Sequence, residues 1–349
     1  MSDLVPDSVP NADETVAKDT ETVAVDAEPA VDKPVRKRRW LKIVLFSLVI
    51  GLCLVLLAAA VDVIVLMQRV DRIAIPPTHL SVADPGQTWV IVGSDNRADV
   101  DEEWVDTYGT GAASVPADHA DIVLVIHRNS QGTQAFAVPR DMWVQPKRGA
   151  ANRLTLMLAA SPDAFVSSLC LSLGIPVDHL VVVHMGALMQ AVDTVGGIDI
   201  TFSHPTRDSA SKLDVPAGVV HLNGDQALAY IRSRRPEHLI DGTWQRVNMV
   251  QGSLDRPKAA VDVLKKVAAK LLHNPNPLLW QKFAWAVSGG VDLDDNTSAF
   301  DLLSLINAVD TSFPVLPVSG TSGTKLMMPS AETFAAIEAA GYQSGACQV

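Results

Sequence analysis

The sequence is short of aromatic and basic residues, and this shortage argues against one large class of function. Aromatic residues make up 5% of the 349 residues, and the formal net charge is −11. A domain that binds nucleic acid usually presents a basic surface, often with aromatic residues that stack on bases. The composition therefore predicts no nucleic-acid partner.

Motifs of several common enzyme classes are also missing. The sequence has no G-x-x-x-x-G-K-[ST] loop, so ordinary nucleotide hydrolysis is not indicated. The stretch at Gly93–Asp95 is not a G-x-S-x-G elbow, so no serine nucleophile is indicated. The three cysteines have no spacing typical of zinc binding. Cys170 and Cys347 either form a disulfide that ties down the C-terminal tail or remain two unpaired thiols.

The N-terminal part of the chain is acidic and then abruptly apolar. Residues 1–35 contain nine acidic residues, two lysines and no Phe, Trp or Tyr, so we expect a disordered tail. Residues 36–67 combine a basic flank with an apolar run that is long enough to cross a bilayer. Because the basic residues precede the run, the positive-inside rule places the tail in the cytoplasm. The sequence thus predicts a single-pass membrane protein with an extracytoplasmic domain.

The remaining chain divides into a stalk, a large domain and a C-terminal segment. Residues 68–85 contain three prolines and are expected to form an extended spacer. Residues 86–320 form the expected catalytic domain. Residues 321–349 are expected to contain one helix and a loose end.

Strand and helix patterns alternate along the large domain, which predicts an α/β fold with a central mixed β-sheet flanked by helices. Apolar runs predict strands at residues 88–93, 120–128, 133–144, 178–185 and 198–202. Helical spacing predicts helices at residues 161–174, 186–197, 223–235, 256–274, 299–309 and 330–341. Ser161 and Asn223 are the expected N-caps of two of these helices, and Gly174 is an expected stop.

Charged residues stand at the ends of three of these strands. Asp95 and Arg97 follow the first strand, Asp121 opens the second, and Arg140 and Asp141 interrupt the third. Ligand sites in open α/β sheets gather at strand ends, and carboxylates beside arginines suit a phosphate held with Mg²⁺. The alternatives are that the aspartates are turn or cap residues and that Arg140 and Asp141 form a surface pair.

A run of arginines raises a related question in a chain that is acidic overall. Arg232, Arg234 and Arg235 lie within four residues, and Arg246 follows. If residues 231–235 are extended, Arg232 and Arg234 point to the same side and repel each other unless an anion lies between them. The alternative is a solvated surface.

Taken in order, six segments resemble the LytR-CpsA-Psr family of cell-wall glycopolymer ligases. The resemblance covers about residues 86–275, and more loosely extends to about 320. The segments are IVGSDNR, HADIVLVIHRNSQGTQAFAVPRDMWV, LGIPVDHLVVVHM, VDTVGGIDI, HLNGDQALAYIRSRR and QRVNMVQ. The resemblance implies a transferase of cell-wall assembly, which moves a phosphoglycopolymer from a polyprenyl-pyrophosphate lipid carrier to peptidoglycan. It also implies that Mg²⁺ is the cofactor and that the lipid tail of the carrier lies in an apolar groove between sheet and helices.

The resemblance also implies roles for individual residues. Asp95 and Asp121 would hold the metal, and Arg140 and Asp141 would be catalytic, with Asp141 orienting Arg140 or the acceptor. The residues expected to bind the pyrophosphate are Arg97, Arg140, Arg232, Arg234, Arg246 and Gln251.

Several positions depart from the family pattern, which commonly has other residues there. His119 stands where the family commonly has an arginine, Thr243 where it has an aspartate, and Thr155 where it has an asparagine. Just before Gln251, Met249 and Val250 stand where the family has an arginine and a glutamine. These changes imply that fewer side chains bind the pyrophosphate on the Arg246 side of the site. Two alternatives therefore stay open: a lipid-pyrophosphate hydrolase, and a non-catalytic protein of wall assembly or regulation that binds the lipid carrier.

Overall fold

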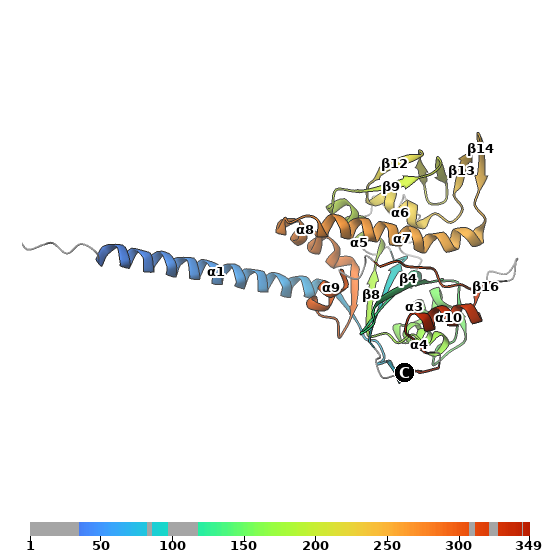
Figure 1. Ribbon diagram of the computed structural model, residues 1–349, viewed down its shortest axis with the longest axis horizontal. Helices are drawn as coiled ribbons and strands as arrows, with labels where there is room; N and C mark the ends of the chain where they lie inside the picture. The colour runs from blue at the N-terminus through green and yellow to red at the C-terminus, as the bar shows by residue number, and fades with distance from the viewer. Residues whose placement is uncertain (1–34, 82–85, 97–117, 307–310, 321–326, 344) are drawn as a thin grey trace, which may run out of the picture. The chain divides into compact units, whose positions relative to one another are not determined.

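The structure, a computed structural model, describes residues 35–81, 86–96, 118–306, 311–320, 327–343 and 345–349 (Figure 1). The chain divides into two compact units, residues 1–57 and residues 58–349. The tail predicted at residues 1–35 lies almost entirely outside the described residues, and so does Arg97.

One helix has the properties of a membrane span. Helix α1 covers Val35–Arg69, and an 18-residue window within its segment Arg39–Arg69 has a mean hydropathy of 3.0. By length and composition this segment is long and apolar enough to cross a bilayer. The finding supports the predicted single-pass membrane anchor.

The second unit is built on a six-stranded sheet with the order β1-β15-β8-β3-β4-β5. β3 runs parallel to β8 and β1 runs parallel to β15, whereas the other neighbours are antiparallel, so the predicted mixed sheet is confirmed. The strands are β1 (Asp71–Ile73), β15 (Val291–Asp294), β8 (His179–Val183), β3 (Gln87–Ser94), β4 (Ala120–Asn129) and β5 (Gly132–Val138).

These strand directions bring several chain segments to one edge of the sheet. β3, β5 and β8 end at this edge, while β4 and β15 begin there, because antiparallel neighbours run in opposite directions. We call this edge, which carries Asp95, Asp121, Arg140, His184 and Asp292, the polar edge.

Helices cover both faces of the sheet, as predicted (Figure 1). Side chains alternate along β3, so that Val90 and Val92 pack in one core while Trp89 packs in the other. The first core includes residues of α3 (Leu154–Ala160), α4 (Pro162–Leu173) and α10 (Ala331–Ala339). The second core includes residues of α5 (Met185–Thr194), α6 (Gly224–Arg232), α7 (Met249–Leu272), α8 (Pro277–Val287) and α9 (Ala299–Ile306).

Smaller sheets complete the unit. The predicted strand at residues 198–202 is not part of the central sheet; it forms β9 (Ile198–Phe202) and pairs with β12 (Gly218–Leu222). A four-stranded sheet has the order β11 (Leu213–Val215), β10 (Thr206–Asp208), β13 (Glu237–Ile240) and β14 (Thr243–Arg246). Three short pairs join β6 (Trp143–Val144) to β7 (Asn152–Arg153), β16 (Ser319–Gly320) to β17 (Met327–Met328), and β18 (Cys347–Gln348) to β2 (His79–Leu80).

Helix ends follow the expected local signals in two cases. The Ser161 side chain accepts a hydrogen bond from Ala164 N, and Gly174 adopts a left-handed conformation with φ of 72°. Asn223 and Gln226 form the predicted capping box. Some boundaries were wrong: α7 begins at Met249, seven residues earlier than expected, and α6 ends at Arg232, three residues before the expected end at residue 235. Arg232 is therefore helical, and the extended conformation considered for residues 231–235 does not include it.

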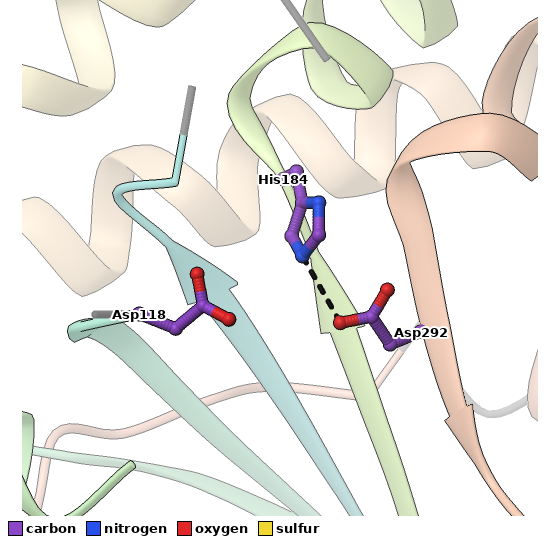
Figure 2. Close-up of side chains that lie close together, drawn as sticks. All are labelled: Asp118, His184 and Asp292. Atoms are coloured by element: carbon purple, nitrogen blue, oxygen red, sulfur yellow. Dashed lines mark hydrogen bonds and ion pairs between the residues drawn. The ribbon is translucent and has the colours of Figure 1, made fainter. Parts of the chain in front are cut away.

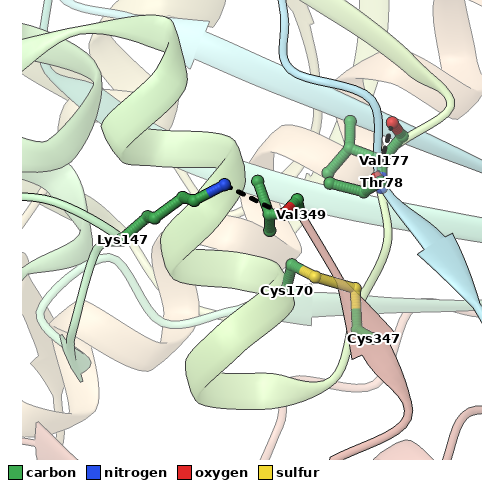
Figure 3. Close-up of a disulfide and its surroundings, with 6 residues drawn as sticks. All are labelled: Thr78, Lys147, Cys170, Val177, Cys347 and Val349. Atoms are coloured by element: carbon green, nitrogen blue, oxygen red, sulfur yellow. Dashed lines mark hydrogen bonds between the residues drawn. A yellow bond between two sulfur atoms is a disulfide. The ribbon is translucent and has the colours of Figure 1, made fainter.

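The two segments expected to be extended or loose are both attached to the domain. The predicted stalk contributes β1 to the central sheet and β2 to a pair with β18. The C-terminal end is held by β18 and by a disulfide between Cys170 and Cys347, so the pairing alternative is the one present (Figure 3). Lys147 Nζ also donates to the main-chain oxygen of Val349 at 2.9 Å. The expectations of a separate stalk and a loose end were therefore wrong.

Candidate phosphate-binding site

The strand-end residues predicted from the sequence meet at the polar edge. Asp95 follows β3, Asp121 is the second residue of β4, and Arg140 lies two residues after β5. A cavity of about 250 Å³ opens at this edge, with Asp95 and Asp121 in its lining. Its other lining residues are Met185, Ala210, Arg232, Arg234 and Arg256. Arg232 and Arg234 thus line the same cavity, although Arg232 is helical and the segment is not extended there.

Asp121 is the centre of this cluster. Its Oδ1 accepts a hydrogen bond from Arg140, and its Oδ2 accepts one from Arg256 Nη2 at 2.6 Å. Arg234 Nη2 lies 3.8 Å from the same oxygen. Burial by itself would raise the pKa of Asp121, but Arg256, Arg140 and Arg234 outweigh it and hold the pKa below its usual value. The carboxylate is therefore ionised and surrounded by guanidinium groups.

Three guanidinium groups, those of Arg140, Arg234 and Arg256, lie around the single carboxylate of Asp121, so positive charge is in excess. Burial lowers the pKa of Arg234, and repulsion from Arg256 and Arg140 lowers it further. Arginine nonetheless stays protonated in proteins, so the repulsion is not relieved by loss of a proton. An anion with several oxygens would relieve it and would match the paired N–H groups of arginine.

Arg256 is the site residue that the sequence analysis missed. It belongs to α7 and is only 3% exposed. A signal was available, because Ala259, Ala260 and Val263 follow at helical spacing and are all buried, which places Arg256 on the buried side of the helix. The Nε atoms of Arg140 and Arg256 are buried and, within the described residues, have no hydrogen-bond acceptor.

Asp208 holds residues 232–235, which we call the arginine segment, in place. This aspartate of β10 is 5% exposed, and its Oδ2 accepts hydrogen bonds from Ser233 Oγ at 2.8 Å, Arg234 N at 3.0 Å and Arg235 N at 3.1 Å. Burial would raise the pKa of Asp208, but the bond from Arg235 and the others keep it below its usual value. Asp208 therefore fixes the backbone at the point where α6 ends. Nothing in the local sequence pattern indicated this role.

Two residues predicted to grip the pyrophosphate lie away from Asp121. Arg246, in β14, is 64% exposed and bonds Glu237 through Nη2 at 2.6 Å. It lines a separate cavity with Arg207 and Arg235. Gln251 donates to Asp255 on the same helix at 2.9 Å. The structure thus groups Arg140, Arg232 and Arg234 with Asp121, and it does not group Arg246 or Gln251 with them.

Asp141 contacts the side chain of Arg140, and Thr155 bonds its backbone. Arg140 Nε lies 3.7 Å from Asp141 Oδ2, and Arg153 Nη1 lies 3.4 Å from Asp141 Oδ1. The backbone N–H of Thr155 donates to the carbonyl oxygen of Arg140 at 2.9 Å. These contacts fit the expectation that Asp141 orients Arg140.

The other departures from the family pattern have different surroundings. The ring of His119 lies 3.1 Å from Asp95 Oδ2, and its backbone N–H donates to Asp95 Oδ1 at 2.9 Å. Thr243 is exposed at the start of β14. The side chains of Met249 and Val250 lie outside the described residues.

The two candidate metal ligands, Asp95 and Asp121, differ in their suitability. Both supply carboxylate oxygens of the kind that Mg²⁺ prefers, and both line the same cavity. Both oxygens of Asp121, however, already accept guanidinium donors. A cation alone would be repelled there, so this donor set fits Mg²⁺ when the ion arrives together with phosphate oxygens.

An apolar groove adjoins the charged cavity. Asp121, Arg232 and Arg256 line both. The rest of its lining comes mainly from strands of the sheet and from α5, α6 and α7, and includes Ile91, Ile122, Leu124, Leu188, Leu228 and Leu264. This is the position in which a groove between sheet and helices was expected.

Comparisons with known proteins agree with this architecture. The sequence profile of the LytR_cpsA_psr family matches residues 71–298. The solved structure of the LytR-Csp2A-Psr enzyme from Actinomyces oris superposes with a TM-score of 0.65 at 26% identity, covering 80% of this chain and 98% of that one. The structure of TagV from B. subtilis shares the fold, with a TM-score of 0.53 at 20% identity, covering 74% of this chain and 98% of that one.

Two curated relatives are named for cell-wall functions. The probable cell wall biosynthesis protein LcpB of Corynebacterium glutamicum is 28% identical over 169 residues, which cover 48% of this chain and 41% of that protein. The polyisoprenyl-teichoic acid–peptidoglycan teichoic acid transferase TagU of Enterococcus faecalis is 23% identical over 252 residues, 72% of this chain and 78% of that one. The chain spans between 41% and 52% of the first three curated relatives that it matches.

The family match covers well over half of the chain and includes the six strands of the central sheet, helices α3 to α8 and the segment with Arg232, Arg234 and Arg235. It begins at Asp71, where β1 joins the central sheet. On this evidence, the chain belongs to the LytR_cpsA_psr family.

Proposed function

We propose that this protein is a membrane-anchored transferase that moves a phosphoglycopolymer from a polyprenyl-pyrophosphate carrier to peptidoglycan. One observation carries the proposal: a cavity lined by Arg232, Arg234 and Arg256 adjoins an apolar groove. Such a pair of sites suits a ligand with a pyrophosphate head and a long hydrocarbon tail. The names of the relatives TagU and LcpB support the same reaction class.

The reaction is a phosphoryl transfer. A hydroxyl oxygen of the peptidoglycan acceptor forms a bond to the phosphorus that carries the glycan. The bond from this phosphorus to the bridging oxygen breaks, polyprenyl phosphate leaves with the electron pair, and the hydroxyl proton passes to a base. Arg140, Arg234 and Arg256 offset the charge on the phosphate oxygens, because such reactions depend mainly on positioning and electrostatic stabilisation. Asp141 orients Arg140 through its contact with Nε.

Mg²⁺ is proposed as the cofactor, held by Asp95 and Asp121 together with pyrophosphate oxygens. Bound there, the ion would neutralise charge on the phosphates. The arginine partners of Asp121 argue that this ion binds with the substrate and not before it. The proposed location is the cell membrane, with the tail in the cytoplasm and the catalytic domain outside.

The test uses the full-length protein in detergent with Mg²⁺, a polyprenyl-pyrophosphate-linked disaccharide and a peptidoglycan oligomer. Mass spectrometry detects the phosphodiester-linked product. We expect product only when the acceptor is present, and its loss in Arg140→Ala. Arg128→Ala, at the opposite end of the neighbouring strand β4, is the matched control and should keep activity.

Other outcomes would replace the proposal. Release of polyprenyl phosphate without acceptor would make the protein a lipid-pyrophosphate hydrolase. Carrier that is bound but left intact under all acceptors would make it a non-catalytic binding protein of wall assembly.

A further inference from the structure

A second cluster of ligand-type side chains lies on the polar edge, beside the arginine-rich cavity. It consists of Asp118, His184 and Asp292, and one ligand atom from each lies within 4.8 Å of the others (Figure 2). Asp118 lies two residues before β4, His184 directly follows β8, and Asp292 is the second residue of β15. In Figure 2 the two carboxylates flank the end of the imidazole that carries Nε2.

The backbone fixes two members of this cluster side by side. β8 and β15 are antiparallel neighbours in which Val183 pairs with Val291. Just beyond this pair, the N–H of His184 donates to the carbonyl of Gly290 at 2.9 Å. Side chains that project from paired strands keep their geometry better than side chains on loops.

The charge balance here is opposite to that around Asp121. The side chains of His184 and Asp292 are only 10% and 12% exposed. Asp118 accepts a hydrogen bond from Ser94 Oγ at 3.2 Å. Among the residues that the structure describes, no lysine or arginine forms a salt bridge with Asp118 or Asp292. Two carboxylates this close to each other repel, and a bound cation would remove this repulsion.

We propose that Asp118, His184 and Asp292 bind a divalent transition-metal ion, Zn²⁺ or Mn²⁺. One imidazole and two carboxylates form a borderline ligand set that suits these ions. His184 Nε2 and Asp292 Oδ2 are 3.1 Å apart, close to the roughly 3–3.5 Å expected between neighbouring ligands of an ion with bonds of about 2.1 Å. A small rotation of Asp118 completes the set.

Binding would change protons and coordination in a defined way. The imidazole coordinates metal through an unprotonated Nε2, so its hydrogen must lie on Nδ1, and the hydrogen bond between His184 and Asp292 is replaced by bonds to the metal. Three protein ligands leave a further position for water or a phosphate oxygen. His184 also lines the apolar groove, so the ion would border the proposed lipid site.

The experiment measures metal binding directly and uses no lipid. Full-length protein in detergent is treated with EDTA and then titrated with Zn²⁺, Mn²⁺ or Mg²⁺ by calorimetry, and Co²⁺ serves as a spectroscopic probe. All samples carry Cys53→Ser, because Cys53 is a free, exposed cysteine and cysteine is itself a zinc ligand. The variants are His184→Asn and Asp118→Asn. His221→Asn is the matched control, since His221 bonds Asp199 at 2.8 Å on the exposed surface.

We expect one Zn²⁺ or Mn²⁺ per chain, bound at least about tenfold more weakly in both variants and unchanged in the control. Thermal unfolding should shift upward with metal in the parent protein and less in the variants. If the parent protein binds no ion, binds only Mg²⁺, or binds one ion that both variants retain, the proposal is wrong. If His184→Asn does not fold, the metal titration of Asp118→Asn tests the proposal by itself. Because no substrate is present, the result is independent of the proposed transferase activity.

Discussion

Arg256 and Asp121 are 135 positions apart in the sequence, and yet Arg256 Nη2 lies 2.6 Å from Asp121 Oδ2. The contact joins helix α7 to the beginning of strand β4 at the polar edge. Since Arg256 is 3% exposed, the pair is largely removed from water. It fixes the position of the carboxylate around which Arg140 and Arg234 gather.

Replacing Arg256 should damage both stability and activity. Arg256→Met leaves Asp121 with less compensation, and breaking a buried pair typically costs about 3–5 kcal/mol of unfolding free energy. Transfer activity per folded molecule should also fall, by about 10²-fold. Urea unfolding and the product assay measure the two effects. Lys258→Met, two residues along the same helix and exposed, should change neither; equal effects of the two variants would contradict the role given to Arg256.

Asp208→Asn should weaken activity through the backbone of the arginine segment. The substitution keeps the size of the side chain but removes the charge that accepts three hydrogen bonds at Ser233, Arg234 and Arg235. We expect kcat to fall more than KM rises, because Arg234 would be misplaced rather than absent. Circular dichroism should show the same secondary structure. A variant with unchanged kcat would show that the segment is held by other contacts.

Arg234 and Arg246 should differ in their effect on substrate binding. Arg234 lines the cavity with Asp121, whereas Arg246 pairs with Glu237 elsewhere. Arg234→Gln should therefore weaken binding of the pyrophosphate carrier by about tenfold or more, since charged hydrogen bonds contribute about 1.5–3 kcal/mol. Arg246→Gln should have a small effect. Titration of a fluorescent lipid-pyrophosphate analogue measures both, and a reversed order would mean that the hairpin β13–β14 closes over the substrate.

The stability of the fold should fall in acid, partly because of Asp294. This carboxylate is fully buried; burial would raise its pKa, but hydrogen bonds from His179, Thr297 and Leu180 N hold the pKa below its usual value. An aspartate with a lowered folded pKa stabilises the fold above its unfolded pKa of about 3.9, and this contribution is lost as the pH falls through the folded pKa. Urea unfolding from pH 7 downwards should show a drop that begins near pH 4, and Asp294→Asn should make it shallower. Asp214→Asn, on the exposed side of β11, should follow the unmodified profile.

The disulfide should contribute substantially to stability. It closes a loop of 177 residues and attaches the last strand to α4. Cys347→Ser should lower the unfolding free energy by about 2–5 kcal/mol, because the unfolded chain gains freedom. The free energies of oxidised protein and variant can be compared by urea unfolding. Reduction of the unmodified protein should reproduce the loss, and Cys53→Ser should not.

The sequence by itself determined the features that depend on near neighbours. Hydropathy identified the helix at Val35–Arg69, and side-chain periodicity identified most of the sheet. The caps at Ser161 and Asn223 followed from contacts within one helical turn. The strand-end residues Asp95 and Asp121 could be proposed because strand ends of an α/β sheet share an edge.

Only the tertiary structure decided which distant residues meet at that edge. Helix α7 brings Arg256 to Asp121, β10 brings Asp208 to the arginine segment, and the hairpin β13–β14 takes Arg246 away from it. The same holds for β1, which pairs with β15 across more than two hundred residues. These contacts depend on how helices and strands pack over long sequence separations, and local propensity carries no information about such packing.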